Sequence, residues 1–201
     1  MRYLEKQFKT ILNKYKLIDN WFWCRYGVNP YNGCEFGCVY CDTRSQKYHM
    51  REDFSETVVA KKSPAEMLDR RISRARTLLP DVVATGSAAD PYQKAERRFR
   101  NTRSILEVLF KHRYSVHVIT KSDIVIDDLD LLRDIAERSW ATVSLTITCA
   151  DADTAAFIEP NAPDPDKRFG VIERIKRDAG AVQCGVLLMP LLPGLTDSND
   201  N

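Results

Sequence analysis

The stretch that decides the fold reads GCEFGCVYC at residues 33–41. Its cysteines, Cys34, Cys38 and Cys41, follow a C-x3-C-x2-C spacing, and the aromatic Tyr40 directly precedes the last of them. Three thiols this close in sequence can converge on one metal centre, and cysteine thiolates are the usual ligands of [4Fe–4S] clusters. Since such a cluster has four irons, three cysteines leave one iron open to a small molecule, as a catalytic zinc keeps a position open for its substrate.

Two other kinds of site use the same cysteines. A structural zinc knuckle and an ordinary electron-transfer cluster both normally require a fourth ligand, for which Cys24 and His49 are the nearest candidates. The alternatives to an enzyme are therefore a non-catalytic iron–sulfur electron carrier and a zinc-stabilised nucleic-acid-binding module. The C-x3-C spacing with Tyr40 before the last cysteine favours the open cluster.

The composition is that of an ordinary globular chain. Its 201 residues are 44% hydrophobic and carry 30 Lys+Arg against 28 Asp+Glu, which fits one domain or two small ones. No apolar run reaches the roughly 18 residues of a membrane span, and residues 1–20 lack the features of a secretory signal. We therefore expect a cytoplasmic protein without membrane contact. In that reducing compartment a tight cysteine cluster binds metal or does redox chemistry more often than it forms disulfides.

Outward from the cysteines, the chain alternates between strand and helix patterns. The predicted strands cover residues 21–28, 57–60, 81–85, 115–120, 141–148 and 182–189. The predicted helices cover residues 3–18, 64–79, 102–112, 127–138, 152–158 and 165–178. Repeated strand–helix units predict an α/β fold with a parallel sheet covered by helices. Periodicity alone fits both a doubly wound open sheet and a partial (β/α) barrel.

These patterns also predict the organisation of the chain. Residues 1–20 form an N-terminal helix and residues 21–201 form the core domain. About five strands are parallel, and the last, residues 182–189, is an apolar open edge with no sixth strand after it. Such an edge invites pairing, so either a partner chain covers it or the chain is a C-terminally truncated fragment of a longer protein.

The cysteine run resembles the cluster motif of radical S-adenosylmethionine (SAM) enzymes. The start of this run and four further segments, in the same order, resemble the spore photoproduct lyase-like (SplB-like) subgroup of that superfamily. The matching segments are Asn29–Cys38 (NPYNGCEFGC), Asp90–Gln93 (DPYQ) with Glu96–Arg98 (ERR), Ile119–Ser122 (ITKS), Glu159–Pro163 (EPNAP) and Pro190–Asp197 (PLLPGLTD). The resemblance implies a partial (β/α) barrel of the radical SAM type.

The resemblance also implies a cofactor pair and a reaction. Cys34, Cys38 and Cys41 would bind a [4Fe–4S] cluster whose fourth iron is chelated by S-adenosyl-L-methionine. The reduced cluster would cleave SAM to methionine and a 5′-deoxyadenosyl radical, which abstracts hydrogen from an unknown substrate. A low-potential electron donor such as flavodoxin or ferredoxin would supply the electron.

Five further residues are implied to contact SAM. Tyr40 would pack near the adenine, and Gly86 and Ser87, after strand 81–85, would hold the amino group. Lys121, just past strand 115–120, would approach the carboxylate, and Thr146 would contact the ribose. Ligands of parallel α/β folds bind beyond the carboxyl ends of strands, which is where these residues are expected.

The chain departs from the subgroup at residues 87–94. Ala89 stands where the subgroup has Thr, and Lys94 stands where it has Pro. The loop also lacks the hydrogen-donating cysteine of spore photoproduct lyase, so the resemblance does not extend to DNA repair. Cys149 is the alternative hydrogen donor, although it also fits a small buried hydrophobe. The near-neutral net charge disfavours a nucleic-acid substrate.

Overall fold

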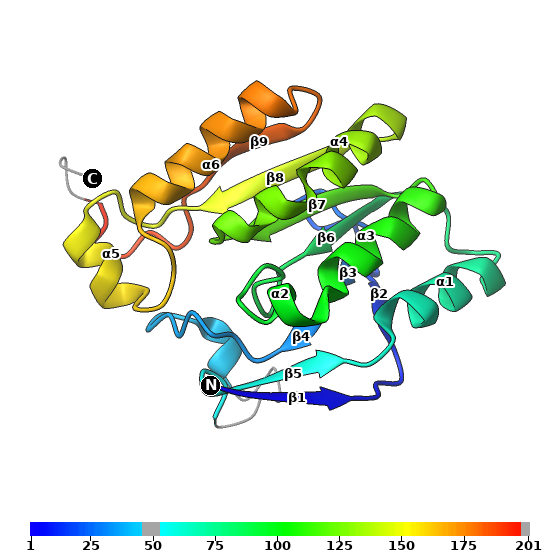
Figure 1. Ribbon diagram of the computed structural model, residues 1–201, viewed down its shortest axis with the longest axis horizontal. Coiled ribbons are helices and arrows are strands. Elements are labelled where there is room, and N and C mark those ends of the chain that lie inside the picture. Colours follow the sequence, from blue (N-terminus) through cyan, green and yellow to red (C-terminus); the bar gives the residue numbers. More distant parts are fainter. Residues whose placement is uncertain (46–52, 198–201) are drawn as a thin grey trace.

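The computed structural model describes residues 1–45 and 53–197 of the chain, which form two sheets (Figure 1). The large sheet has the order β2 (Leu12–Lys14), β3 (Tyr26–Val28), β6 (Val82–Thr85), β7 (Ser115–Thr120), β8 (Ala141–Thr146) and β9 (Gln183–Leu187). The small sheet has the order β1 (Arg2–Lys6), β5 (Thr57–Lys61) and β4 (Tyr31–Asn32). The helices are η1 (Asp42–Arg44), α1 (Pro64–Arg74), α2 (Glu96–Phe99), α3 (Asn101–Lys111), η3 (Asp123–Asp128), α4 (Leu129–Arg138), α5 (Ala152–Ile158) and α6 (Pro165–Asp178).

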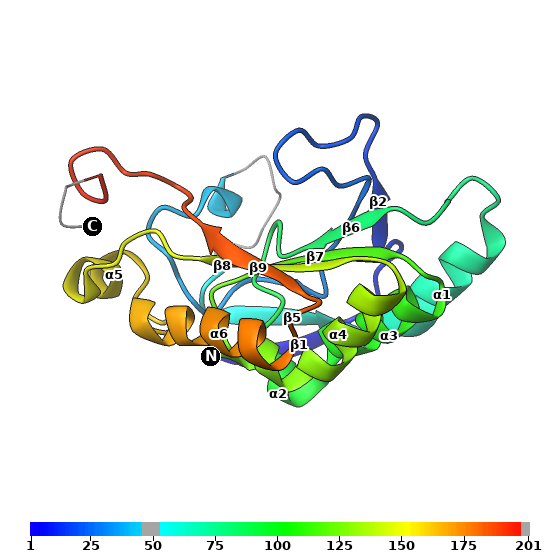
Figure 2. The ribbon, with the colours of Figure 1, turned by 90° about the horizontal axis from the view of Figure 1, so that it is seen from above.

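Five strands of the large sheet, β3, β6, β7, β8 and β9, run parallel, and β2 adds an antiparallel strand beside β3. The helices lie on one side of this sheet, whereas the β2–β3 loop, the cysteine loop and the segment after β9 lie on the other (Figure 2). The prediction of a partial (β/α) barrel with five parallel strands and β9 at its edge is therefore confirmed.

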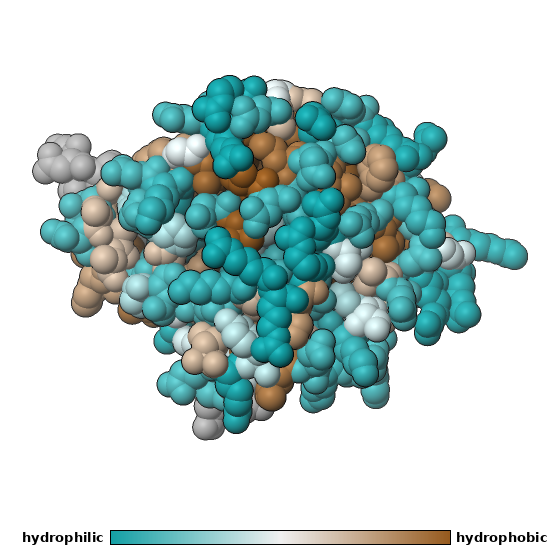
Figure 3. All heavy atoms as spheres, viewed as in Figure 1, coloured by the Kyte–Doolittle hydropathy of each residue, from teal (hydrophilic) through white to brown (hydrophobic). Residues whose placement is uncertain are grey.

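The core lies between the sheet and the helices. Side chains alternate between the two faces of a strand, and Val116, Val118, Val143 and Leu145 of β7 and β8 are all completely buried in one apolar cluster with residues of α3, α4 and α6. The outer face of the helices is mostly hydrophilic (Figure 3). The residues that alternate with this apolar set face the other side of the sheet, where the loops gather.

Helix starts follow local capping chemistry. The Asp164 side chain accepts a hydrogen bond from the backbone N–H of Lys167 at 2.8 Å, and Pro165 occupies the first turn of α6. At α3, the buried Glu96 carboxylate accepts from the backbone N–H groups of Thr102 and Arg103.

None of the helices in the described ranges is long and apolar enough to cross a bilayer.

The predicted helix over residues 3–18 is wrong. β1 pairs in parallel with β5, and β2 pairs with β3, so residues 1–20 contribute one strand to each sheet instead of a separate element. A lone helix of this length is marginal in water, whereas the strands gain backbone hydrogen bonds from distant partners. They also bury Ile11 and Leu12, which are 3% and 7% exposed.

Several boundaries also differ from the predictions. The strand predicted over residues 21–28 is only Tyr26–Val28, which is β3. The residues before it form a turn, because the Asp19 carboxylate accepts from the N–H groups of Trp21 and Phe22. Helix 64–79 ends at Arg74, because Tyr114 and Tyr26 donate to the carbonyls of residues 78 and 79 and hold that backbone outside the helix.

The Ser63 hydroxyl makes no capping bond to α1, since the residue adopts a left-handed conformation with φ of 49°. Strands 141–148 and 182–189 each end two residues early, at Thr146 and Leu187. The short strand predicted at residues 57–60 is β5, which belongs to the small sheet.

Candidate active site

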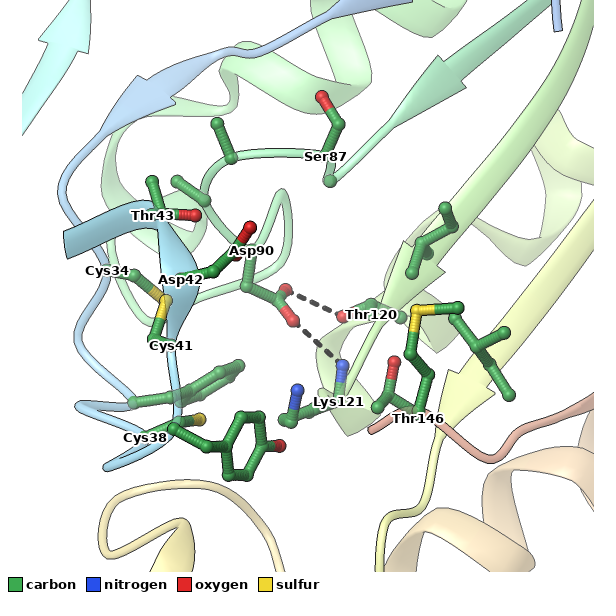
Figure 4. A pocket seen from close by; sticks show the side chains of 18 of the residues that line it. Cys34, Cys38, Cys41, Asp42, Thr43, Ser87, Asp90, Thr120, Lys121 and Thr146 are labelled. Atoms are coloured by element: carbon green, nitrogen blue, oxygen red, sulfur yellow. Dashed lines mark hydrogen bonds between the residues drawn. The ribbon is translucent and has the colours of Figure 1, made fainter. Parts of the chain in front are cut away.

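A cavity of about 460 Å³ lies beyond the carboxyl ends of β6, β7 and β8. All eight residues predicted to form the site line it: Cys34, Cys38, Tyr40, Cys41, Gly86, Ser87, Lys121 and Thr146. Figure 4 shows the three cysteines on one side of the cavity and Lys121 and Thr146 on the other. The topology therefore brings together residues that are more than 100 positions apart in sequence.

The three cysteines of the loop are free thiols that form one wall of this cavity. Burial raises the pKa of Cys34 to about 12 and also raises the pKa of Cys38, so both are neutral thiols unless a cation binds them. Within the described ranges no three His, Cys, Asp or Glu side chains converge tightly enough for a single metal ion. The donor set, three thiols around an open space, fits a larger cluster that leaves a position free.

Of the two candidates for a fourth ligand, Cys24 does not line the cavity. Cys24 is 2% exposed and lies at the end of the β2–β3 loop, apart from the residues that line the cavity. His49 lies outside the described residues. Cys149, the alternative hydrogen donor, is 3% exposed and packs behind the wall in an apolar cluster with Tyr40 and Leu192.

The cysteine loop is held in place by a buried side chain from the DPYQ segment. The Gln93 amide donates to the Gly33 carbonyl at 3.0 Å and accepts from the Glu35 N–H at 3.0 Å. The Glu35 carboxylate in turn accepts from the Ala95 N–H at 2.7 Å and from the Tyr3 hydroxyl at 3.1 Å. The sequence pointed to this segment by resemblance alone, and its role here is to clamp the loop that carries the thiols.

Two glycines allow the loops to approach the sheets closely. Gly33 has φ of +90°, and a Cβ there would lie 2.2 Å from the Thr57 carbonyl oxygen. Gly86 has φ of +92°, and a Cβ there would lie 2.2 Å from the Ile119 carbonyl oxygen. Any other side chain would push the loop after β6 away from β7.

Asp90 organises the end of β7 beside Gly86. Its partly buried carboxylate accepts from the Thr120 hydroxyl at 2.7 Å and the Lys121 N–H at 2.8 Å (Figure 4). It also accepts from the Tyr92 N–H at 2.9 Å. Burial raises the pKa of this carboxyl, and the three donors oppose that effect. Asp90 itself lines the cavity, so it belongs to the site although the predicted set did not include it.

A second acidic residue, the buried Glu159, contacts two of the residues that line the cavity. The Tyr40 hydroxyl donates to its carboxylate in a short hydrogen bond, and the Lys121 ammonium lies 3.8 Å from it. The same ammonium lies 5.6 Å from the centre of the Tyr40 ring. Burial, followed by the negative charge of Glu159, raises the pKa of Tyr40, so the phenol stays protonated. In the sequence, Glu159 is the first residue of the EPNAP segment, and the resemblance of that segment implies no role for it.

Two arginines that follow the DPYQ segment, Arg100 and Arg103, form ion pairs with carboxylates. Arg100 and Arg103 each contact the completely buried Asp128 at 2.9 Å, and Arg103 also pairs with Asp130 at 3.3 Å. These arginines neutralise a buried carboxylate, which also accepts from the Tyr92 hydroxyl. Their role is therefore to hold the DPYQ loop against η3 and α3.

Comparison with known proteins gives a family match over most of the chain. The sequence matches the model of the Radical SAM superfamily over residues 28–200. An uncharacterized protein of Mycobacterium tuberculosis H37Rv is 30% identical over 181 residues, which cover 88% of this chain and 52% of that protein. An uncharacterized protein of Methanocaldococcus jannaschii is 27% identical over 174 residues, which cover 86% of this chain and 62% of that protein. The chain thus spans little more than half the length of these relatives.

The fold is similar to solved radical SAM structures. Spore photoproduct lyase complexed with dinucleoside spore photoproduct superposes with a TM-score of 0.69 at 14% identity, over 95% of this chain and 52% of that one. A variant of that lyase with bound AdoMet gives 0.57 at 15% identity, over 83% and 46% of the two chains. The cobalamin-dependent radical enzyme OxsB gives 0.52 at 10% identity, over 80% and 23%. At these identities the likeness concerns the fold.

Proposed function

The chain belongs to the radical SAM superfamily, and from this premise we propose that its cavity holds a [4Fe–4S] cluster on Cys34, Cys38 and Cys41 with SAM beside it. The observation that carries the proposal is the meeting of these three thiols with Gly86, Lys121 and the other predicted SAM contacts in one cavity. When bound, the two groups supply reductive cleavage of SAM to a 5′-deoxyadenosyl radical that abstracts hydrogen from a substrate.

The residues on the far side of the cavity are suited to hold SAM. Gly86 lets the backbone after β6 approach a ligand closely, and Ser87 adds a hydroxyl. Lys121 offers a positive charge for a carboxylate, and its backbone is fixed by Asp90. Tyr40 and Thr146 line the remaining space. The bound AdoMet of the spore photoproduct lyase variant supports this assignment.

The apolar side chains of the lining would keep water away from the reacting groups. Phe22 of the β2–β3 loop, Phe36 of the cysteine loop and Met189 after β9 all line the cavity. Such a lining excludes water, which would otherwise quench a reactive intermediate. Because a cluster open at one iron is sensitive to oxygen, we place the protein in the reducing cytoplasm, with a low-potential flavodoxin or ferredoxin as electron donor.

Two observations separate the substrate of this chain from that of spore photoproduct lyase. The hydrogen-donating cysteine of spore photoproduct lyase has no counterpart at residues 87–90, and the nearby arginines are neutralised by Asp128. We therefore propose a substrate other than the photoproduct of that lyase.

Anaerobic reconstitution with iron and sulfide tests the proposal. We expect a brown protein that forms 5′-deoxyadenosine from SAM in the presence of dithionite. Alanine at Cys34, Cys38 or Cys41 should abolish the chromophore, whereas Cys184→Ala, a change on β9 outside the cavity, should keep it.

Two results would contradict the proposal. A full [4Fe–4S] signal in all three cysteine variants would remove the cluster from this loop. Loss of the cluster in Cys24→Ala would indicate a site closed by four cysteines and an electron carrier in place of an enzyme.

A further inference from the structure

Glu159 connects four separate segments around the site. It follows α5 and is 2% exposed. Its carboxylate contacts Tyr40 of the cysteine loop, Lys121 after β7, Thr148 after β8 and Arg168 in α6. Two of these partners, Tyr40 and Lys121, line the cavity, and the other two lie behind it.

We propose that Glu159 is a positioning residue that sets where the Tyr40 ring and the Lys121 ammonium face the cavity. The inference rests on the proposed function, since these two side chains matter only if the cavity binds SAM. Glu159 itself is not among the residues that line the cavity, so it acts through its two partners.

The Glu159 carboxylate is itself part of a buried ion pair. Arg168 is 1% exposed and lies 2.5 Å from one Glu159 oxygen. The Arg168 guanidinium also donates to the Thr146 carbonyl at 2.9 Å and to the Pro163 carbonyl at 2.7 Å. These contacts fix the pair to the end of β8 and to the start of α6, so the second carboxylate oxygen has one defined direction.

That second oxygen points at the site. It accepts hydrogen bonds from the Tyr40 hydroxyl and from the Thr148 hydroxyl, the latter at 3.0 Å, and it lies 3.8 Å from the Lys121 ammonium. Because Arg168 already neutralises the Glu159 carboxylate, the contact with Glu159 does not neutralise the positive charge of Lys121. It stays available for an anionic group in the cavity.

Stability alone does not explain a charged pair at this place. Buried ion pairs contribute little to folding compared with apolar residues of similar volume, because desolvation cancels most of their attraction. An apolar residue at position 159 would fill the space without directing the Tyr40 hydroxyl or holding the Lys121 ammonium. The arrangement is therefore explained better by the geometry it imposes on the cavity.

The test compares SAM binding by reconstituted wild-type protein and by Glu159→Gln, using anaerobic calorimetry. The amide keeps the size and one acceptor but loses the charge. We expect unchanged iron and sulfide content and an affinity for SAM at least about tenfold weaker, as for the loss of one charge-assisted hydrogen bond. Glu173→Gln, an exposed change on the same helix as Arg168, should bind SAM like the wild type.

Glu159→Gln leaves the Arg168 charge buried without a partner, so this variant could fail to fold. A second variant keeps the inference testable in that case. Glu159→Leu combined with Arg168→Met removes both charges and so avoids that penalty. It should fold and bind the cluster, yet it should also bind SAM weakly. Either variant should reduce the change that SAM causes in the electron paramagnetic resonance spectrum of the reduced cluster.

Tyr40→Phe shows whether the effect passes through the tyrosine. If it does, Glu159→Gln should weaken SAM binding less in the Tyr40→Phe background than in the wild type. Wild-type affinity in folded, cluster-containing Glu159→Gln and in the Leu/Met variant would overturn the inference and leave the proposed function standing. A wild-type protein that binds no SAM would overturn the proposed function itself.

Discussion

At the scale of single residues, the site depends on backbone positions that few side chains tolerate. Gly86 combines a positive φ with close approach to the Ile119 carbonyl. Asp90 and Gln93 then use their side chains to tie the same loop to β7 and to the cysteines. The loop after β6 therefore reaches the cavity because Gly86 has no side chain and because the Asp90 and Gln93 side chains tie the loop down.

Replacing Gly86 by a residue with a side chain should therefore destabilise the folded protein. We expect Gly86→Ala to lower the free energy of unfolding by about 2–4 kcal/mol, since the left-handed backbone and the clash with the Ile119 carbonyl add together. Urea unfolding followed by circular dichroism measures this change. Gly170→Ala is the matched control, because Gly170 lies inside α6 with no atom near its added Cβ. It should stabilise the protein by about 0.5–1 kcal/mol, and equal effects of both variants would contradict the prediction.

The buried imidazole of His117 should make the stability of the protein depend on pH. It is 7% exposed on β7, donates to or accepts from the Ser144 hydroxyl at 2.8 Å and packs on the Phe22 ring. Burial lowers its pKa, so the unfolded chain binds a proton at higher pH than the folded protein does. The free energy of unfolding should therefore fall as the pH drops below about 6.5.

The variant His117→Asn isolates this contribution to the pH dependence. Its unfolding free energy should change less with pH than that of the wild type between about pH 5 and pH 7. Chemical unfolding at several pH values measures the slope, and identical slopes for the two proteins would contradict the assignment.

At the scale of elements, the clamp between the DPYQ segment and the cysteine loop joins two pieces of chain that share no regular secondary structure. Gln93 is completely buried and makes both of its main bonds to the backbone at residues 33 and 35. The small sheet supports the same loop from the other side, since Tyr3 of β1 donates to Glu35. The position of the thiols thus depends on contacts that span three elements.

Removing the clamp should loosen the loop without changing any cysteine. Gln93→Leu leaves a buried carbonyl and a buried N–H without partners, which should cost about 2–4 kcal/mol of stability. We also expect reduced iron content after reconstitution. The exposed neighbour Lys94→Leu is the control and should keep both properties. Full iron loading in Gln93→Leu would show that the loop holds its shape without the clamp.

At the scale of the whole molecule, the large sheet ends in an unprotected strand. Among the described residues, β9 pairs with β8 on one side only. Val186 on β9 is 48% exposed, and Leu188 just after it is 54% exposed. An edge of this kind offers unpaired backbone groups beside apolar side chains.

We therefore expect the 201-residue chain to self-associate as its concentration rises, and light scattering after size-exclusion chromatography measures this. A lysine on the edge should oppose the pairing, so Val186→Lys should be more monomeric than the wild type. Glu137→Lys, on the exposed surface of α4, is the control for added charge. A wild type that stays monomeric at every concentration would contradict the prediction.

Local sequence patterns determined much of this protein. The C-x3-C-x2-C spacing and the alternating strand and helix patterns predicted the cysteine loop, the five parallel strands and the helices, and α6 was predicted to the residue. These features follow from short-range chemistry, such as the Asp164–Pro165 helix start. The resemblance then predicted which residues of the strand ends meet, and the topology brings them together in one cavity.

Only the tertiary structure decided the rest, because it depends on partners far away in sequence. Residues 3–18 have helical periodicity, but their strands are stabilised by pairing with β5 and β3. Glu159 looks like any surface carboxylate until the fold buries it between Tyr40 and Arg168. A periodic pattern describes which face of an element is apolar, whereas the burial of a charge and its partner are properties of packed elements.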